Sequence, residues 1–121
     1  MKLLAEIFVG IVALEHLYIL WLEMFAWTTQ GKKTFKTLPA EHFEKTKEMA
    51  GNQGLYNGFL SAGLVWSLLI TDAAWSHNVA LFFLSCVIIA GVYGAATVQK
   101  SIFFVQAMPA LIALFFVLIC R

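Results

Sequence analysis

The sequence predicts an all-α integral membrane protein that folds as a four-helix bundle. Of its 121 residues, 61% are hydrophobic and only 12% are charged, whereas a soluble domain carries roughly 25% charged residues. The charges are also missing from long runs, each close to the ~20 apolar residues with which a helix crosses a bilayer. Four such segments and their connections occupy the whole length, so we expect residues 1–121 to form a single transmembrane domain.

Four helices are expected, separated by segments rich in polar residues, glycine or proline. They cover about residues 3–27, 43–70, 79–98 and 102–120. The second helix has a polar first half and becomes apolar from Leu55 onwards, so only its second half can face lipid on all sides. Pro109 falls inside the fourth helix, where a membrane protein tolerates it as a kink.

The distribution of lysine and arginine predicts the orientation, because cytoplasmic loops of membrane proteins are enriched in these residues. One side of the expected bundle carries Lys32, Lys33, Lys36, Lys45, Lys47 and Lys100, and the other side carries Lys2 and Arg121. We therefore expect the basic loop 28–42 in the cytoplasm, both termini outside and the lipid bilayer as a partner. A net charge of +1 argues against a nucleic-acid partner.

The first helix carries Glu15, His16 and Glu23, which form a polar stripe that cannot face lipid. Ionisable residues inside a bilayer are expensive and are candidates for function by default. They are interpreted either as pairing with the second helix to hold the bundle together, or as binding a ligand or exchanging protons. A metal ion would need three or four converging ligands, so we expect no metal site here.

The second helix carries a longer polar pattern at helical spacing. Glu44, Glu48, Asn52 and Tyr56 recur every four residues and therefore share one face, with Gln53 beside them. Such a face must be buried in protein or line a polar cleft. Alternatively, the polar half is a helical extension into water.

Part of this pattern resembles a known signature. The residues Phe43-Glu44-Lys45, Asn52-Gln53, Tyr56, Phe59-Leu60 and Leu64-Trp66 resemble the second-helix motif of the MAPEG superfamily. These are the membrane-associated proteins of eicosanoid and glutathione metabolism. The whole chain more closely resembles a bacterial family of four-helix membrane proteins of unknown function. That second resemblance lies in Glu15-His16 and Leu22-Glu23-Met24-Phe25.

The MAPEG resemblance implies a homotrimer in the plasma membrane, with ligand sites between neighbouring subunits near the cytoplasmic side. It implies that glutathione is a possible ligand, held by Asn52 and by Glu44 or Glu48, with Tyr93 at the same cleft. Glutathione-using members grip their ligand with several arginines, whereas this sequence has only Arg121. That departure argues against a conventional glutathione transferase.

The leading functional hypothesis is therefore a trimer that binds a small amphiphilic or glutathione-like ligand in intersubunit clefts. A competing hypothesis is a proton-coupled small-molecule exporter that uses Glu15, because small multidrug transporters of similar length carry a glutamate at a comparable place. Two further hypotheses are a glutathione-dependent membrane transferase and an enzyme that acts on a lipid-like substrate with Glu15 or His16 as acid or base.

Overall fold

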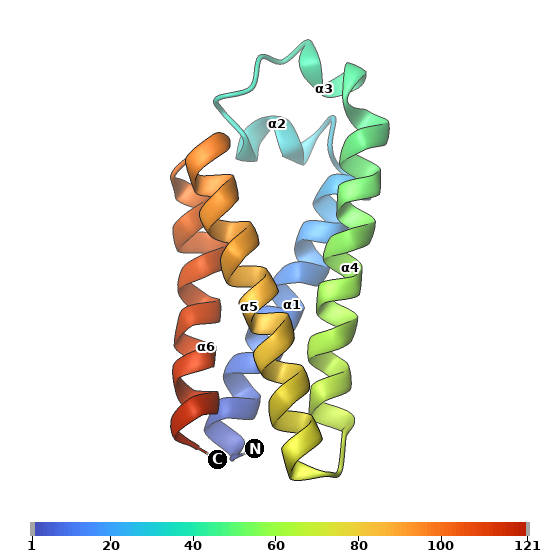
Figure 1. Cartoon of the computed structure of the whole chain (residues 1–121). Helices are drawn as coiled ribbons and strands as arrows, with labels where there is room; N and C mark the ends of the chain where they lie inside the picture. Colours follow the sequence, from blue (N-terminus) through green and yellow to red (C-terminus); the bar gives the residue numbers. More distant parts are fainter. Residues whose placement is uncertain (1, 121) are drawn as a thin grey trace.

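The regular elements of the described residues are all helices, and the all-α prediction is confirmed. The computed structural model describes residues 2–120, and this part of the chain forms six α-helices and one π-helical segment. They are α1 (Leu3–Phe25), α2 (Gln30–Thr34), α3 (His42–Lys45), α4 (Lys47–Leu69), α5 (Ala73–Thr97), the π-helical η1 (Phe103–Ala107) and α6 (Met108–Ile119). The long helices run side by side, with the two termini at one end and α2 and α3 at the other (Figure 1).

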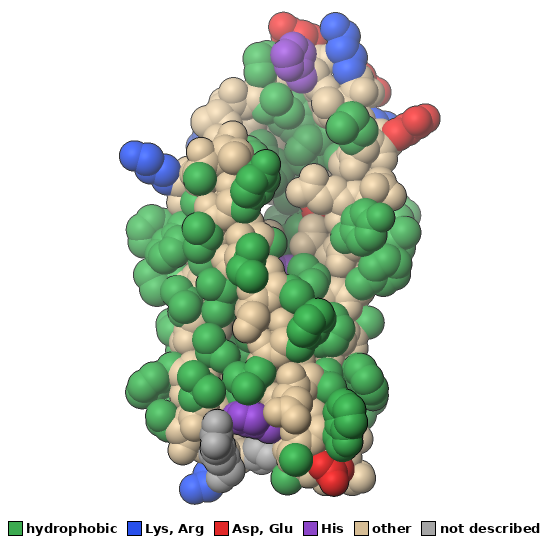
Figure 2. All heavy atoms as spheres, in the orientation of Figure 1, with side chains coloured by type: hydrophobic (Ala, Val, Ile, Leu, Met, Phe, Trp, Pro, Cys, Tyr) green, Lys and Arg blue, Asp and Glu red, His purple; other side chains and the backbone are tan. Residues whose placement is uncertain are grey.

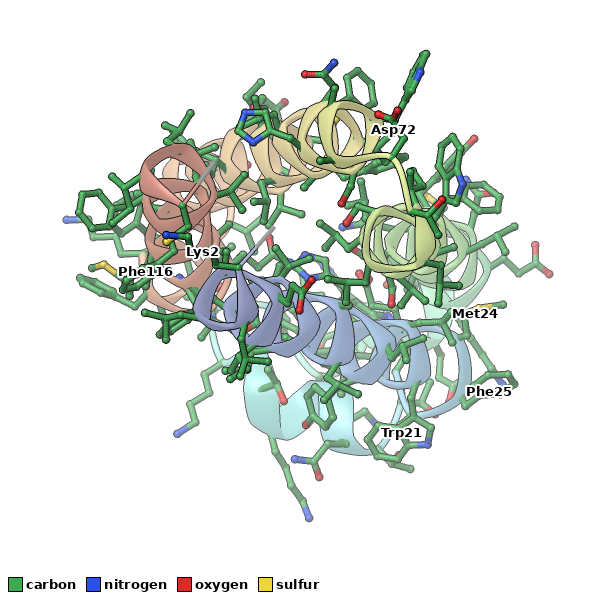
Figure 3. The ribbon with its side chains drawn as sticks, turned by 90° about the horizontal axis from the view of Figure 1, so that it is seen from below. Lys2, Trp21, Met24, Phe25, Asp72 and Phe116 are labelled. Atoms are coloured by element: carbon green, nitrogen blue, oxygen red, sulfur yellow. The ribbon has the colours of Figure 1, made fainter. Side chains whose placement is uncertain are left out.

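Two of the long helices, α1 and α5, are long and apolar enough to cross a membrane. The run Phe103–Ile119, which joins η1 to α6, is also apolar but shorter. Viewed along the helices, α1, α4, α5 and α6 surround a common interior, and Trp21 and Phe25 point away from it (Figure 3).

The boundaries of the helices differ from the expected ones where local capping decides them. We expected residues 71–78 to form a turn, but α5 already begins at Ala73. The side chain of Asp72 accepts a hydrogen bond from the backbone N–H of Trp75 (2.9 Å), which is a favourable helix N-cap. The expected second helix is divided at Thr46 into α3 and α4, and the short helix α2 lies within the expected connection.

The π-helical turn η1 lies directly before Pro109 and has a simple cause. Proline lacks a backbone N–H, so in a regular α-helix the carbonyl of Val105 would lose its donor. The chain widens instead, and the N–H of Met108 donates to the carbonyl of Phe103, five residues earlier. The expected kink therefore takes the form of a π-helical turn.

The helices associate as two close pairs, α1 with α4 and α5 with η1 and α6. Glycines allow both approaches: Gly54 lies against Leu20 and Glu23 of α1, and Gly91 lies against the backbone of Ala107. Small residues of this kind let membrane helices pack closely.

The two pairs meet at the end that carries the termini and diverge towards α2 (Figure 1). At the closed end, the ring of Phe83 lies against Gly63, and the rings of Phe8 and Phe116 stack with centroids 4.8 Å apart. Buried residues from α1, α4, α5 and α6 form one apolar core: Ala5, Val9, Val12, Ala13, Leu64, Ala80, Leu84, Val87, Ala110, Ala113 and Val117.

The contact between α5 and η1 leads to a first prediction. A Cβ atom at Gly91 would lie 2.7 Å from the backbone nitrogen of Ala107, and a backbone cannot rotate away as a side chain can. We expect Gly91→Ala to lower the free energy of unfolding by about 1–3 kcal/mol, the usual cost of overpacking. The measurement is thermal and denaturant unfolding in a mild detergent. The matched control is Gly10→Ala, because nothing lies within 4 Å of a Cβ there; equal losses for both variants would contradict the prediction.

Candidate functional site

Of the site residues expected on α1, His16 and Glu23 are buried inside the molecule and Glu15 is partly buried. The Glu23 side chain is only 4% exposed and lies against α4, where the Nδ2 of Asn57 donates a hydrogen bond to its Oε1 (2.6 Å). The same Nδ2 donates to the backbone carbonyl of Gln53 (3.2 Å), so both hydrogens of this amide are used. One turn further along α4, the hydroxyl of Ser61 donates to the carbonyl of Ala13 in α1 (2.8 Å).

His16 is completely buried, and its hydrogen bonding defines its tautomer. Nδ1 lies 2.9 Å from the carbonyl oxygen of Val12. Because a carbonyl oxygen only accepts, Nδ1 carries the proton, and Nε2 of the neutral ring is therefore an acceptor. Among residues 2–120, neither His16 Nε2 nor Glu15 Oε1 has a hydrogen-bond partner, although both atoms are buried.

The structure divides the polar pattern of the expected second helix between the two sides of α4. Asn57 and Ser61 face inwards to α1, whereas Glu48, Asn52, Gln53 and Tyr56 are exposed. An open hollow of about 520 Å³ lies on this outer side, and we call it the outer hollow. It is lined by Glu48, Met49, Asn52, Gln53 and Tyr56.

The remaining two expected site residues lie elsewhere on the surface. Glu44 is exposed in α3, and Tyr93 is 71% exposed in the part of α5 that diverges from α4. Within one copy of the chain, the expected site residues therefore form an inward group on α1, an outward group on α3 and α4, and Tyr93 alone on α5.

A second hollow, the inner hollow, lies between the diverging parts of α4 and α5 and below α2. Figure 2 shows it with apolar walls, and with acidic and histidine side-chain atoms visible inside. The end of α5 is tied to the segment above the hollow, because Gln99 Nε2 donates to the carbonyl of Thr34 (3.3 Å) and Thr37 Oγ1 donates to that of Val98 (3.5 Å).

Aromatic residues anchor the other end of this covering segment. Trp27 Nε1 donates to Thr46 Oγ1 (3.0 Å), and the Trp27 ring packs on Phe35 and Phe43 with centroids 5.3 and 4.9 Å away. The segment that contains α2 and α3 is thus fixed on both sides, and it closes the inner hollow at that end.

The inward group has carboxyl groups but no lysine or arginine near it in the sequence. No lysine or arginine occurs in the sequence from residue 3 to 31 or from 48 to 99, so the carboxyl groups of Glu15 and Glu23 have no cation on these segments to pair with. No group of three His, Cys, Asp or Glu that could hold a metal ion exists within the described part of the chain.

Asn57 of α4, which binds Glu23 of the inward group, was not predicted as a site residue from the sequence. Its signal in the sequence is its position, because it lies beyond Leu55, in the apolar half of the expected helix. A lone amide in such a segment needs a partner inside the protein. Here the partner is the carboxyl group of Glu23 on the first helix.

The hydrogen bond between Asn57 and Glu23 provides a second prediction. We expect Asn57→Leu to lower the free energy of unfolding by about 1–3 kcal/mol, because it removes the donor from a buried carboxyl group. The double variant with Asn57→Leu and Glu23→Leu should lose less free energy of unfolding than the two single variants lose together. The difference, the coupling energy, should be about 0.5–3 kcal/mol. A double-mutant cycle of denaturant unfolding in detergent measures this coupling. Glu44→Leu with Asn78→Leu, on different helices, is the additive control; additivity in both cycles would contradict the prediction.

Comparisons with known proteins show the family to which the chain belongs. The chain matches the family described as protein of unknown function (DUF1304) over residues 10–118, and it belongs to that family. It is 31% identical over 116 residues to the uncharacterized protein YpaA of Lactococcus lactis subsp. lactis (strain IL1403), an alignment that covers 94% of this chain and 96% of the relative. No solved structure matches the chain.

Proposed function

We propose that this member of the DUF1304 family is a multi-pass plasma-membrane protein that binds a small amphiphilic ligand between the copies of a homotrimer. The observation that carries the proposal is the outer hollow: an open depression on α4, lined by both polar and apolar side chains, of which one copy of the chain supplies only one wall.

The surface of the molecule supports the bilayer as its surroundings. Large apolar side chains are exposed on every long helix, among them Phe25, Leu69 and Ile89 at 73%, 74% and 69%. Apolar patches of this extent are unusual on soluble monomers. With α1 and α5 as spans, the apolar parts of α4 and of η1 with α6 complete a four-helix transmembrane bundle that forms a single domain over residues 1–121.

The charges support an orientation within that bilayer. Lys32, Lys33 and Lys36 lie in the segment that contains α2, at the end opposite the termini. By the preference of lysine for cytoplasmic loops, this segment faces the cytoplasm and both termini lie outside.

The outer hollow supports an assembly of copies. Its amide, carboxyl and phenol groups lie on a helix face that is otherwise exposed, and polar groups that face lipid are costly. A neighbouring copy would cover them. A head-to-tail contact closes into a ring when the rotation between copies permits it, and the resemblance of residues 43–66 to the MAPEG signature favours a ring of three.

The lining of the outer hollow supports binding rather than thiol transfer. About 520 Å³ suits a small molecule, and Met49 and Tyr56 offer apolar surface beside the polar atoms of Asn52 and Gln53. The charged residue of the lining is Glu48, whereas activation of a glutathione thiol requires positive charge nearby. The ligand is therefore an amphiphile or a glutathione-like molecule that is held but not activated.

The trimer predicts a specific contact between copies. If Tyr93 of one copy faces the outer hollow of the next, Asn52→Cys and Tyr93→Cys on separate chains will form a disulfide-linked dimer when mixed and reconstituted. Both chains carry Cys86→Ala and Cys120→Ala to remove the native thiols. Gel electrophoresis detects the product, and native mass spectrometry should give three copies. Phe104→Cys, exposed in η1, replaces Tyr93→Cys as the control; equal cross-linking at both positions, or a dimeric mass, would overturn the assembly.

Ligand binding in the outer hollow predicts a stabilisation that depends on Asn52. We expect lysophosphatidylcholine or glutathione, tested separately, to raise the unfolding midpoint of the wild-type protein in nanodiscs, because binding to the folded state alone stabilises it. Asn52→Ala should abolish most of this rise, whereas Asn78→Ala, on α5 and outside the outer hollow, should retain it. A rise that is the same in both variants would place the ligand elsewhere.

A further inference from the structure

We propose that the inner hollow is a binding site for a protonated primary amine with an apolar tail, whose ammonium group is held by Glu15 and His16. The site lies inside a single copy, so it does not depend on the trimer or on the outer hollow. Three observations lead to it. The two side chains are neighbours on α1, each has a buried acceptor atom without a hydrogen-bond partner, and no lysine or arginine lies in the surrounding sequence.

The two side chains are consecutive residues of α1 and flank its inward direction. Adjacent residues of an α-helix are about 100° apart, so Glu15 and His16 each point about 50° to one side of the direction midway between them. Val12 and Ile19, roughly one turn before and after, lie along that direction, and both are buried in the interior. His16 is fully buried and Glu15 is partly buried, and from the two sides of this direction their side chains can approach one small group.

The unmet hydrogen bonds of the pair are all of one kind. The carboxylate of Glu15 can only accept, and Nε2 of His16 accepts because Nδ1 already carries the proton that faces Val12. Both Glu15 Oε1 and His16 Nε2 are buried, and neither has a partner among the described residues. Buried polar atoms without partners are rare in native proteins, so an additional donor is expected at this place.

The buried polar donors on the facing side of α4 are already engaged. Asn57, the amide on the facing side of α4, has committed both hydrogens to Glu23 and to the Gln53 carbonyl. Ser61 donates to Ala13, and the sequence lacks lysine and arginine from residue 3 to 31 and from 48 to 99. A donor from outside the chain would satisfy the two acceptors that the described residues leave without a partner.

An ammonium group fits these requirements best. It supplies three N–H donors in a compact volume and a positive charge that balances the buried carboxyl groups of Glu15 and Glu23. A primary amine is favoured over a quaternary one, because the site presents acceptor atoms that lack donors and a quaternary ammonium has no N–H to donate. The apolar walls of the inner hollow and its side opening between α4 and α5 accommodate an alkyl tail (Figure 2).

The test uses the full-length protein in nanodiscs with n-hexylammonium as the probe, and n-hexanol and hexyltrimethylammonium as matched compounds. Hexanol has the same tail without the charge, and hexyltrimethylammonium has the charge without N–H donors. We expect a saturable rise in the unfolding midpoint with hexylammonium, at a concentration about tenfold lower than either matched compound requires, because a charge-assisted hydrogen bond is lost in each. Equal effects of the three compounds would overturn the proposal and indicate partition into the bilayer, or a site that holds only water.

Variants locate the site. Glu15→Gln and His16→Phe should each weaken hexylammonium binding by about tenfold or more, since each removes one acceptor of the ammonium group. Glu41→Gln, an exposed carboxylate outside both hollows, removes the same charge and should leave hexylammonium binding unchanged. Loss of binding in Glu41→Gln, or full binding in both α1 variants, would overturn the assignment.

A measurement on the unmutated protein guards against variants that fail to fold. In protein labelled with ¹⁵N-histidine, the chain's three histidines give separate imidazole signals, and His42→Gln and His77→Gln identify the remaining one as His16. Hexylammonium should shift the Nε2 resonance of His16 in the direction of a hydrogen-bonded acceptor and leave Nδ1 protonated, whereas hexyltrimethylammonium should not. An unchanged Nε2 resonance at saturating hexylammonium would overturn the proposal.

Discussion

The hydrogen bond from Asn57 to Glu23 fixes the relation between α1 and α4, on which the rest of the structure depends. A buried carboxyl group is costly unless a donor meets it, so the hydrogen bond to Glu23 favours one register of α1 against α4. In that register Ser61 reaches the carbonyl of Ala13, and Gly54 allows the backbones to approach. The helices α1 and α4 therefore form one half of the molecule. This half contacts α5 and α6 at the end that carries the termini.

The register of α4 also explains why its polar residues serve two sides. Residues four apart share a face of a helix, so Asn52 and Tyr56 point together to the outer hollow, while Asn57 is turned about 100° from Tyr56 towards α1. Gln53 belongs to both sides, because its side chain lines the outer hollow and its carbonyl accepts from Asn57.

Much of the fold could be predicted from the sequence, because low charge and long apolar runs dictate helices. The polar positions Glu15, His16 and Glu23 also stood out, since ionisable residues are rare in such runs. The early start of α5 depended on one cap, Asp72, and the π-helical turn depended on how the chain accommodates Pro109. The MAPEG resemblance and the trimer remain predictions. The partner of Glu23 could not be identified, because periodicity shows which residues share a face but not which helix that face meets.

The two hollows differ in what their polar groups lack, and this difference separates their roles. The outer hollow presents amides and a phenol, which both donate and accept, and it is open to a neighbouring copy. The inward pair of Glu15 and His16 presents acceptors alone in a buried place. A surface of mixed character suits a polar headgroup or another chain, whereas a buried site of acceptors requires a donor with positive charge. Under the two proposals, one helix pair would hold two chemically different ligands, because α4 exposes one set of polar groups outwards and shields the other set behind it.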